Sequence, residues 1–209
     1  MALYDKFRYM YPPRPEYCLS DDQLIKYEKD HFIQPKLNGS CATIYIKKEE
    51  IKNFGRHRNE NLSNFTLSDD DLKILNCGNK NWNVFVGEYM NKNKKGVDGK
   101  PWNHKFVIFD ILVYNGEYLL GTTFQERVKL LDNIFDIVEE NDYLYKITDK
   151  IYRVKTFYDN FQKRWKDIIK IDMFEGFVLK KINQKLTRGT TEKNNLSHKC
   201  RKPTKNYVF

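Results

Sequence analysis

The sequence predicts an α+β domain built on antiparallel β-sheet. Segments rich in β-branched and aromatic residues lie near both ends of the chain, whereas helical periodicity is confined to its middle. The 209 residues, of which 40% are hydrophobic and 15% aromatic, can bury one substantial core. No internal repeat or long linker divides the chain. Strands that flank a helical middle, within the length of one domain, are typical of the α+β class.

The first 30 residues are expected to form an arm and a short helix, packed on a domain of residues 31–209. Three prolines within Tyr11–Pro15 stiffen an extended backbone. Ser20, followed by two aspartates, can cap a helix that runs to about Asp30.

From residue 31 onward, the pattern changes to that of strands. Helices are expected where apolar residues recur every three or four positions, over Thr123–Val138 and over Phe157–Ile169. A basic turn with two glycines, Asn91–Lys100, separates two of the strands. The strand segments are, in order, His31–Leu37, Cys41–Lys47, Asn81–Met90, Lys105–Tyr114, Gly176–Ile182 and Tyr207–Phe209.

The charge balance favours a phosphate-rich partner. The chain has 37 Lys and Arg against 28 Asp and Glu, which gives a net charge of +9. Each phosphate that such a surface neutralises releases counterions, so nucleic acid is a suitable partner. A merely basic surface would give the same count, and the charge is therefore permissive rather than diagnostic.

Several classes of protein are disfavoured by what the sequence lacks. The four cysteines are widely scattered without a Cys-x-x-Cys pair, and the four histidines have no metal-ligand spacing. Reduced thiols are expected, with no zinc site and no disulfide framework. The N-terminal sequence lacks the apolar run of a signal peptide, and no stretch reaches the ~18 apolar residues that span a membrane. We expect a soluble cytoplasmic protein without a membrane partner.

Five short motifs carry residues suited to phosphate chemistry. In the first, a lysine at the end of a strand precedes a turn that closes with glycine. The others combine acids, aromatics and cations at strand ends. Each alone has an ordinary structural explanation, such as a solvated lysine in a hairpin or an aromatic in the core. The motifs are Gln34–Gly39, Gly87–Glu88, Phe106–Asp110, Glu175–Lys180 and Lys199–Arg201.

The alternation of side chains along a strand groups some of these residues on one face. Gly176, Val178 and Lys180 are expected to point one way, because residues two apart share a face. Lys199 and Arg201 share a face by the same rule. The last two motifs therefore each direct cations toward a common side.

Together and in this order, the five motifs resemble those of the covalent nucleotidyltransferases, which include ATP-dependent RNA ligases, DNA ligases and mRNA capping enzymes. The resemblance covers Ile33 to Phe209 and is greatest to the small RNA ligases of phages and viruses. It implies that residues 31–209 form a ligase-type nucleotidyltransferase domain, an ATP-grasp-like arrangement of antiparallel sheets with flanking helices. It also implies ATP, a covalent AMP intermediate, and Mg²⁺ or Mn²⁺ as cofactors.

The resemblance also implies a role for each motif residue. Lys36 is similar to the nucleophile that becomes adenylylated, Gln34 to the adenine contact, Glu88 to the ribose hydroxyl acceptor and Phe106 to the aromatic stacked on the base. Glu175 resembles the acid that holds the metal. Lys180, Lys199 and Arg201 resemble the phosphate contacts, with Lys202 as an alternative to Arg201. For the 5′-phosphate contact, Arg58 is preferred and Arg56 is the second choice.

Physical chemistry gives independent reasons for such residue types. A lysine with the ordinary pKa of about 10.4 is almost wholly protonated at pH 7 and cannot attack phosphorus. Nearby cations and a divalent metal disfavour the ammonium and stabilise charge on the phosphates. Phosphoryl transfer depends mainly on positioning and charge compensation, which a cluster of Lys and Arg supplies. A glutamate is the hard oxygen ligand that Mg²⁺ and Mn²⁺ prefer.

The expected function is that of an ATP-dependent RNA ligase, acting as a monomer on RNA with 5′-phosphate and 3′-hydroxyl ends. Two features favour RNA over DNA. Cys41 occupies the position where DNA ligases usually carry an arginine, and a C-terminal oligonucleotide-binding domain (OB-fold) is not expected after Arg201. The basic turn Asn91–Lys100 would contact the nucleic-acid backbone. A DNA nick ligase, complete or truncated, an mRNA capping guanylyltransferase and a non-catalytic nucleic-acid-binding module are the alternatives.

Overall fold

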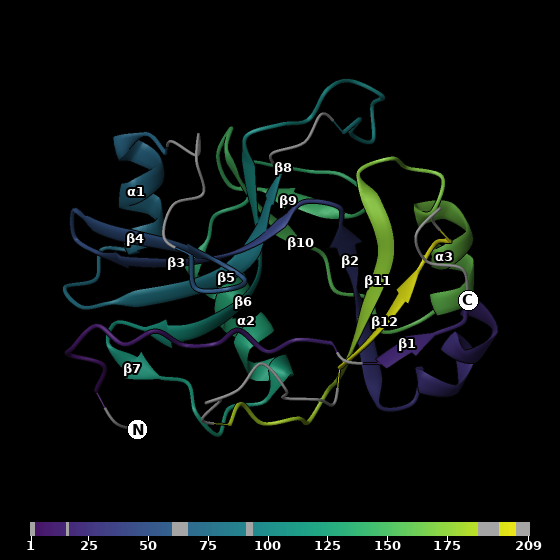
Figure 1. Cartoon of the computed structure of the whole chain (residues 1–209), viewed down its shortest axis with the longest axis horizontal. Helices are drawn as coiled ribbons and strands as arrows, with labels where there is room; N and C mark the ends of the chain where they lie inside the picture. Colours follow the sequence, from purple (N-terminus) through teal and green to yellow (C-terminus); the bar gives the residue numbers. More distant parts are fainter. Residues whose placement is uncertain (1–2, 16, 60–66, 91–93, 188–196, 204–209) are drawn as a thin grey trace.

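The computed structural model describes residues 3–15, 17–59, 67–90, 94–187 and 197–203, which form two β-sheets with helices packed on them (Figure 1). Within these residues one sheet has eight strands and the other has four. Most neighbouring strands are antiparallel, and only β1–β12 and β10–β6 are parallel pairs among those described. The α+β class with antiparallel sheets is therefore confirmed.

The larger sheet contains the middle of the chain, and the smaller sheet joins segments from both ends of it. In sheet order, the larger sheet consists of β4 (Glu50–Gly55), β3 (Ser40–Lys47), β5 (Asn83–Met90), β6 (Lys105–Tyr114), β10 (Ile151–Val154), β9 (Leu144–Lys146) and β8 (Glu139–Glu140), with β7 (Glu117–Tyr118) paired to β6. The smaller sheet consists of β1 (Tyr17–Leu19), β12 (Ser197–Arg201), β11 (Phe174–Lys181) and β2 (His31–Leu37).

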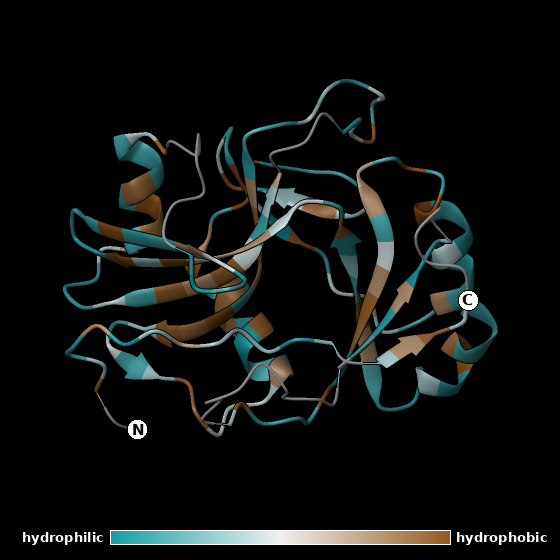
Figure 2. Ribbon diagram, in the orientation of Figure 1, coloured by the Kyte–Doolittle hydropathy of each residue, from teal (hydrophilic) through white to brown (hydrophobic). Residues whose placement is uncertain are grey.

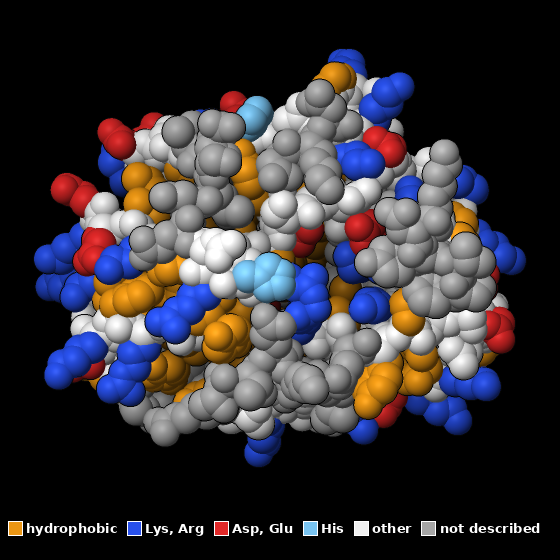
Figure 3. Space-filling model, viewed as in Figure 1, with side chains coloured by type: hydrophobic (Ala, Val, Ile, Leu, Met, Phe, Trp, Pro, Cys, Tyr) orange, Lys and Arg blue, Asp and Glu red, His pale blue; other side chains and the backbone are white. Residues whose placement is uncertain are grey.

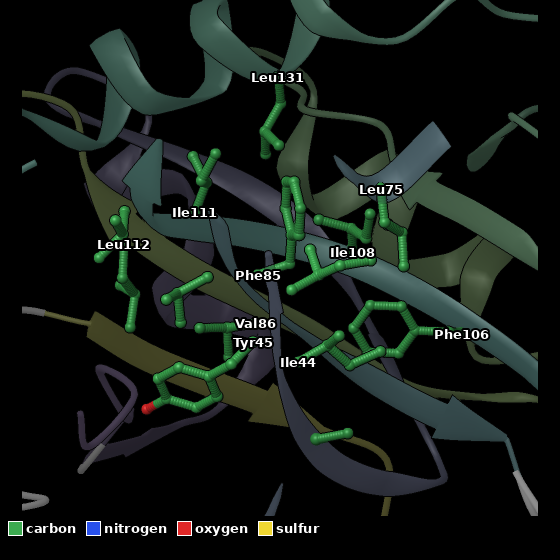
Figure 4. Close-up of a cluster of buried hydrophobic side chains, with 14 of the residues drawn as sticks. Ile44, Tyr45, Leu75, Phe85, Val86, Phe106, Ile108, Ile111, Leu112 and Leu131 are labelled. Atoms are coloured by element: carbon green, nitrogen blue, oxygen red, sulfur yellow. The ribbon is translucent and has the colours of Figure 1, made fainter. Parts of the chain in front are cut away.

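Most buried apolar side chains belong to two hydrophobic cores. The first core is built on the larger sheet and includes Phe85, Phe106 and Ile108, all fully buried (Figure 4). The second core joins the two sheets, since it contains Phe177 of β11 and Val107 of β6 together with Trp165 of α3. Brown segments in Figure 2 mark these apolar strands and helix faces in both halves of the molecule. The β2 to β3 connection links the two sheets directly.

The helices are shorter than the periodicity predicts, for local reasons. The second α-helix ends at Ile134 because Phe135 adopts an extended backbone (φ −121°, ψ 124°) and packs its buried ring against Phe85. The third begins only at Phe161, since Asn160 is left-handed (φ 56°). The helices are η1 (Asp21–Tyr27, a 3₁₀ helix), α1 (Asp69–Asn76), α2 (Phe124–Ile134) and α3 (Phe161–Ile168).

Helix α1 was not expected from the sequence. Ser68 caps it by accepting from the backbone N–H of Asp71, whose carboxylate accepts in return from the Ser68 backbone. The helix has only eight residues, which is too short a segment for periodicity alone to reveal it. The expected terminal strand, 207–209, lies outside the described residues.

A β-bulge interrupts β11 where it pairs with β2. Phe174 is opposite Leu37 and Gly176 is opposite Lys36, so Glu175 is an extra residue on this strand. Gly176 has φ +139°, and a Cβ at this position would lie 2.2 Å from the carbonyl oxygen of Cys200 and 2.5 Å from the Trp165 ring. Only glycine fits this bulge without displacing the neighbouring strand.

We predict that Gly176→Ala lowers the free energy of unfolding by on the order of 3 kcal/mol, because backbone strain and a clash with β12 add together. Gly78→Ala is the matched control, since Gly78 also has positive φ (+66°) but no atom within 4 Å of the added Cβ. The control should lose only about 1 kcal/mol. Urea denaturation measures both values, and equal losses would contradict the proposed close packing at the bulge.

Candidate active site

A cavity of about 550 Å³ lies between the two sheets. Its walls come from β2, β11 and β12 of the smaller sheet, from β3, β5 and β6 of the larger sheet, from the turn after β4, and from the proline-rich arm. Lys, Arg and acidic side chains meet near the middle of the face shown in Figure 3. Residues from four of the five motifs contribute side chains to this cavity, and the fifth contributes Phe109 in place of the expected Phe106.

Lys36 and Glu175 form an ion pair at the centre of the cavity. Lys36 Nζ donates to Glu175 Oε2 at 2.5 Å, and each side chain is 22% exposed. Arg201 Nη1 lies 3.7 Å from the same carboxylate oxygen. With its amide suitably oriented, Asn38 donates to the other oxygen, Oε1, at 3.2 Å. The bulge explains the pairing, because regular alternation would direct Glu175 to the core face of Phe177.

Three cations of the last two motifs converge on the cavity from one face of the smaller sheet. Val178 and Lys180 line it from β11, as do Lys199 and Arg201 from β12, so the predicted shared faces are confirmed. Burial lowers the pKa of Lys199, and the neighbouring charge of Arg201 lowers it further. The cavity is therefore strongly electropositive on this side.

Lys180 is the most deeply buried cation of the site, with only 6% of its surface exposed. Its Nζ donates to the backbone carbonyl of Phe109 at 3.1 Å and lies 5.2 Å from the centre of the Phe109 ring. Burial lowers the pKa of Lys180 to about 8, although the nearby Asp110 carboxylate opposes the shift. Because burial disfavours the charged form of Lys180, an anionic ligand beside it would stabilise the ammonium.

Asp110 and Arg127 support this region, a role not identified from the sequence. Arg127 binds both carboxylate oxygens of Asp110, with Nε at 2.8 Å and Nη2 at 3.1 Å, and both residues are buried. Burial alone raises the pKa of Asp110, but Arg127 and Lys180 together hold it below the ordinary value. Asp110 is therefore a carboxylate that stabilises both cations.

Phe106 does not line the cavity, which corrects the assignment of that ring to the base. Its side chain is fully buried in the first core, where it packs beside Gly87 (Figure 4). Phe109 lines the cavity instead. Residues three apart on a strand lie on opposite faces, so Phe109 and Phe106 point to different sides of β6. Phe109 is also an extra residue, because β6 and β5 shift register between the Ile108–Gly87 and Asp110–Val86 pairs.

Gln34 presents an unsatisfied acceptor near this ring. The side chain is 2% exposed and lines the cavity, and its Nε2 donates to Thr156 Oγ1 at 3.0 Å. Its Oε1 is buried and has no hydrogen-bond partner within the described residues. A buried orphan acceptor is costly unless a ligand completes it, so this oxygen marks a place for a donor.

Glu88 lies across the cavity from the smaller sheet. Its Oε1 accepts from the backbone N–H of Gly39 at 3.0 Å, so it also holds the turn that follows Lys36. A Cβ on Gly39 would lie 2.4 Å from the carbonyl oxygen of Tyr89, which explains the glycine of the first motif. Cys41, at the position of the usual arginine, lines the cavity opposite Glu88 in the β3–β5 register.

The two candidates for the 5′-phosphate contact are separated by the turn after β4. Arg56 lines the cavity, whereas Arg58 lies outside it with its guanidinium 5.4 Å from the centre of the Tyr9 ring. Arg58 is left-handed (φ 61°), which turns its side chain away from the cavity. The geometry thus favours Arg56, the second choice. Lys202 is likewise outside the cavity, because its Nζ donates to the carbonyl of Ile171 at 3.2 Å.

The family model that describes the ATP-dependent DNA ligase domain matches residues 86–199, more than half of the chain. The chain belongs to the ATP-dependent DNA ligase domain family. The match includes the β5, β6 and β11 motifs that line the cavity, and it ends at Lys199, the first residue of the β12 motif. Comparison with curated proteins gave no match.

Solved structures that are similar to this chain include ligases. A mycobacterial DNA ligase D in complex with ATP and MES is 16% identical with a TM-score of 0.59, over 82% of this chain and 54% of that one. The ligase domain of M. tuberculosis LigD is also 16% identical with a TM-score of 0.59, over 84% of this chain and 56% of that one. A mutant Naegleria gruberi RNA ligase with AMP and Mn is 17% identical with a TM-score of 0.47, over 96% of this chain and 58% of that one. This chain thus spans a little over half the length of these structures.

The described residues contain no group of three or more His, Cys, Asp or Glu side chains that could hold a metal ion by themselves. In the part of the chain that the structure describes, the four cysteines form no disulfide with one another. No helix in the described part of the chain is long and apolar enough to cross a membrane.

We predict that Phe109→Leu weakens ATP binding about tenfold while leaving stability nearly unchanged, because the ring faces the cavity. Phe106→Leu is the matched control on the same strand, and it should lower the melting temperature without weakening ATP binding beyond twofold, since that ring only fills the core. Calorimetric titration and thermal melting measure the two properties. The reverse pattern would restore Phe106 as the base contact.

Proposed function

We propose that this chain is the catalytic domain of an ATP-dependent RNA ligase and that Lys36 carries AMP during the reaction. The observation that supports this most directly is the Lys36–Glu175 ion pair at the centre of a cation-rich cavity. A lone structural salt bridge would not need the surrounding Lys180, Lys199 and Arg201, whose mutual repulsion costs stability without an anionic ligand.

In the first step, Lys36 Nζ forms a bond to the α-phosphorus of ATP. The bond from that phosphorus to the bridging oxygen breaks, and pyrophosphate leaves with the electron pair. Attack requires the neutral amine, so the contact with Glu175 must open and the ammonium must release its proton to solvent. Lys180 and Lys199 stabilise the charge that develops on the phosphate oxygens.

Glu175 fits the expected metal ligand. It presents a hard oxygen donor to the cavity, and Mg²⁺ in such sites is held by one or two carboxylates together with substrate phosphates and water. When bound, the ion would supply positive charge at the α-phosphate. Within the protein, Asn38 and Arg201 keep the Glu175 carboxylate facing the cavity.

The base region supports ATP over GTP. Phe109 offers an aromatic surface for the ring, and the orphaned Gln34 Oε1 can accept from the exocyclic amine of adenine. The corresponding position of guanine carries an acceptor oxygen, which would leave the Gln34 oxygen unpaired and repelled. Glu88 is the candidate acceptor for a ribose hydroxyl, and Arg56 is the candidate for the 5′-phosphate of the strand.

In the second and third steps, the strand's 5′-phosphate oxygen attacks the Lys36-linked phosphorus and releases the lysine, and a 3′-hydroxyl then displaces AMP. The net charge of +9 suits a nucleic-acid partner. The described part of the basic turn, residues 94–100, lies near the site, since Lys94 contacts Asn38 and Asp172. Lys92 of that turn lies outside the described residues.

Lys36 substitutions test the assignment of the nucleophile. We predict that Lys36→Ala and Lys36→Arg both abolish capture of label from α-labelled ATP, because neither offers an amine that can attack. Lys36→Ala should still seal a strand that already carries 5′-adenylate, whereas Glu175→Ala should impair both steps. A denaturing gel and a sealing assay measure these effects. Label retained by Lys36→Arg would place the nucleophile elsewhere.

A comparison of nicked RNA and DNA duplexes tests which nucleic acid is the substrate. Cys41 in place of the arginine usual in DNA ligases supports RNA, whereas the family-model match favours a DNA nick ligase as the second candidate. With matched RNA and DNA nicks, we predict that the RNA nick is sealed at least about tenfold faster, equivalent to about 1.4 kcal/mol. Faster sealing of the DNA nick would establish the second candidate. Capture of label from GTP would indicate capping, and no capture would indicate a binding module.

A further inference from the structure

The N-terminal arm connects the two sheets across the face of the cavity. At one end, the backbone N–H of Met10 donates to the Tyr45 hydroxyl at 2.6 Å, and Phe7 stacks on Phe54 with ring centres 5.6 Å apart. At the other end, β1 pairs with β12, so that Tyr17 is opposite His198. Figure 1 shows the purple arm running from the larger sheet to β1. Both ends of the arm are therefore anchored.

Between these anchors, the arm forms part of the cavity wall. Pro12, Pro13, Arg14 and Pro15 all line it, and Pro12 is buried. Prolines fix the backbone on both sides of Arg14, so the position of this residue is restricted before any ligand binds. The wall that carries Arg14 belongs to neither sheet.

Arg14 belongs electrostatically to the same cluster as the motif cations. Its charge contributes to the lowered pKa of Lys199, together with burial, Arg201 and Lys36. Among the described residues, the cavity is lined by six Lys and Arg side chains against two carboxylates. Holding a further half-buried cation in this cluster raises its self-repulsion, which an anionic ligand would relieve.

We propose that Arg14 is a further ligand-binding residue, which contacts the β- and γ-phosphates of ATP. This inference rests on the proposed function. A guanidinium recognises phosphate oxygens through two parallel hydrogen bonds, which a lysine cannot reproduce. The smaller sheet already supplies Lys180 and Lys199 for the α-phosphate, and Arg56 approaches from the turn after β4. Arg14 supplies charge from a separate wall, where the departing pyrophosphate can be held.

This placement makes Arg14 specific to one step. Formation of Lys36–AMP breaks the bond between the α-phosphorus and pyrophosphate, and the reverse reaction uses pyrophosphate as the attacking group. Sealing of a pre-adenylated strand involves no pyrophosphate. A residue that only stabilised the arm would affect these reactions alike, whereas a β,γ-phosphate contact affects the first two alone.

The test compares ligand affinities and reaction steps in Arg14→Gln. Calorimetric titration without divalent metal should show ATP bound about tenfold more weakly and AMP within twofold of the parent protein. Conversion of the Lys36–AMP adduct to free lysine and ATP by inorganic pyrophosphate should need about tenfold more pyrophosphate, while sealing of a pre-adenylated strand stays within twofold. Arg14→Lys should recover part of the loss, because it keeps the charge without the paired geometry.

Arg8→Gln is the matched control, since Arg8 is exposed on the same arm and does not line the cavity. It should leave all four measurements unchanged. Equal weakening of ATP and AMP by Arg14→Gln, or unchanged affinity for both, would overturn the inference. A loss confined to the transfer of AMP to a strand would also overturn it and assign Arg14 to the strand's phosphate. The proposed function fails separately, when the parent protein captures no label from ATP.

Discussion

A β-bulge in β11 determines that the acid of its motif reaches the cavity. The bulge makes Glu175 an extra residue and turns its carboxylate to Lys36, while Phe177 and Leu179 remain in the core. A regular strand would have placed an uncompensated carboxylate in an apolar core, at a cost of several kcal/mol. In β6, ordinary alternation is enough, because Phe109 and Phe106 are three residues apart and lie on opposite faces. The bulge in β11 therefore serves both stability and the site.

The electropositive cavity depends on the buried pair behind it. Lys180 is almost fully desolvated, and its charge is tolerated because Asp110 lies nearby and the Phe109 carbonyl accepts its hydrogen bond. Asp110 is held in place by two hydrogen bonds from Arg127 on α2. Arg127 on α2 thus orients the carboxylate that opposes the lowering of the Lys180 pKa.

Short-range patterns in the sequence predicted the strands but not the irregularities within them. The β2 and β6 segments, and the shared face of Lys199 and Arg201, follow from alternation that the structure keeps. The motif resemblance points to Phe106, and alternation places Phe109 on the opposite face without showing which face lines the cavity. The sequence motif favours Arg58 over Arg56, but Arg58 has a left-handed backbone and its guanidinium lies near the Tyr9 ring, outside the cavity. The positions of bulges and left-handed residues depend on how strands pair in the folded protein, and the spacing of motifs in the sequence does not specify that pairing.

The cavity lies between the two sheets, so its shape depends on the connections between them. In the described chain, two of these are the β2–β3 turn, held by the hydrogen bond from Gly39 to Glu88, and the N-terminal arm. The first connection joins Lys36 to the residue opposite it, and the second brings Arg14 to the remaining wall. Because both connections carry side chains of the site, any relative movement of the sheets changes the distances between the cations and the carboxylates. A polyanion bound in the cavity would oppose that movement, because the cations on opposite walls would then contact one and the same ligand.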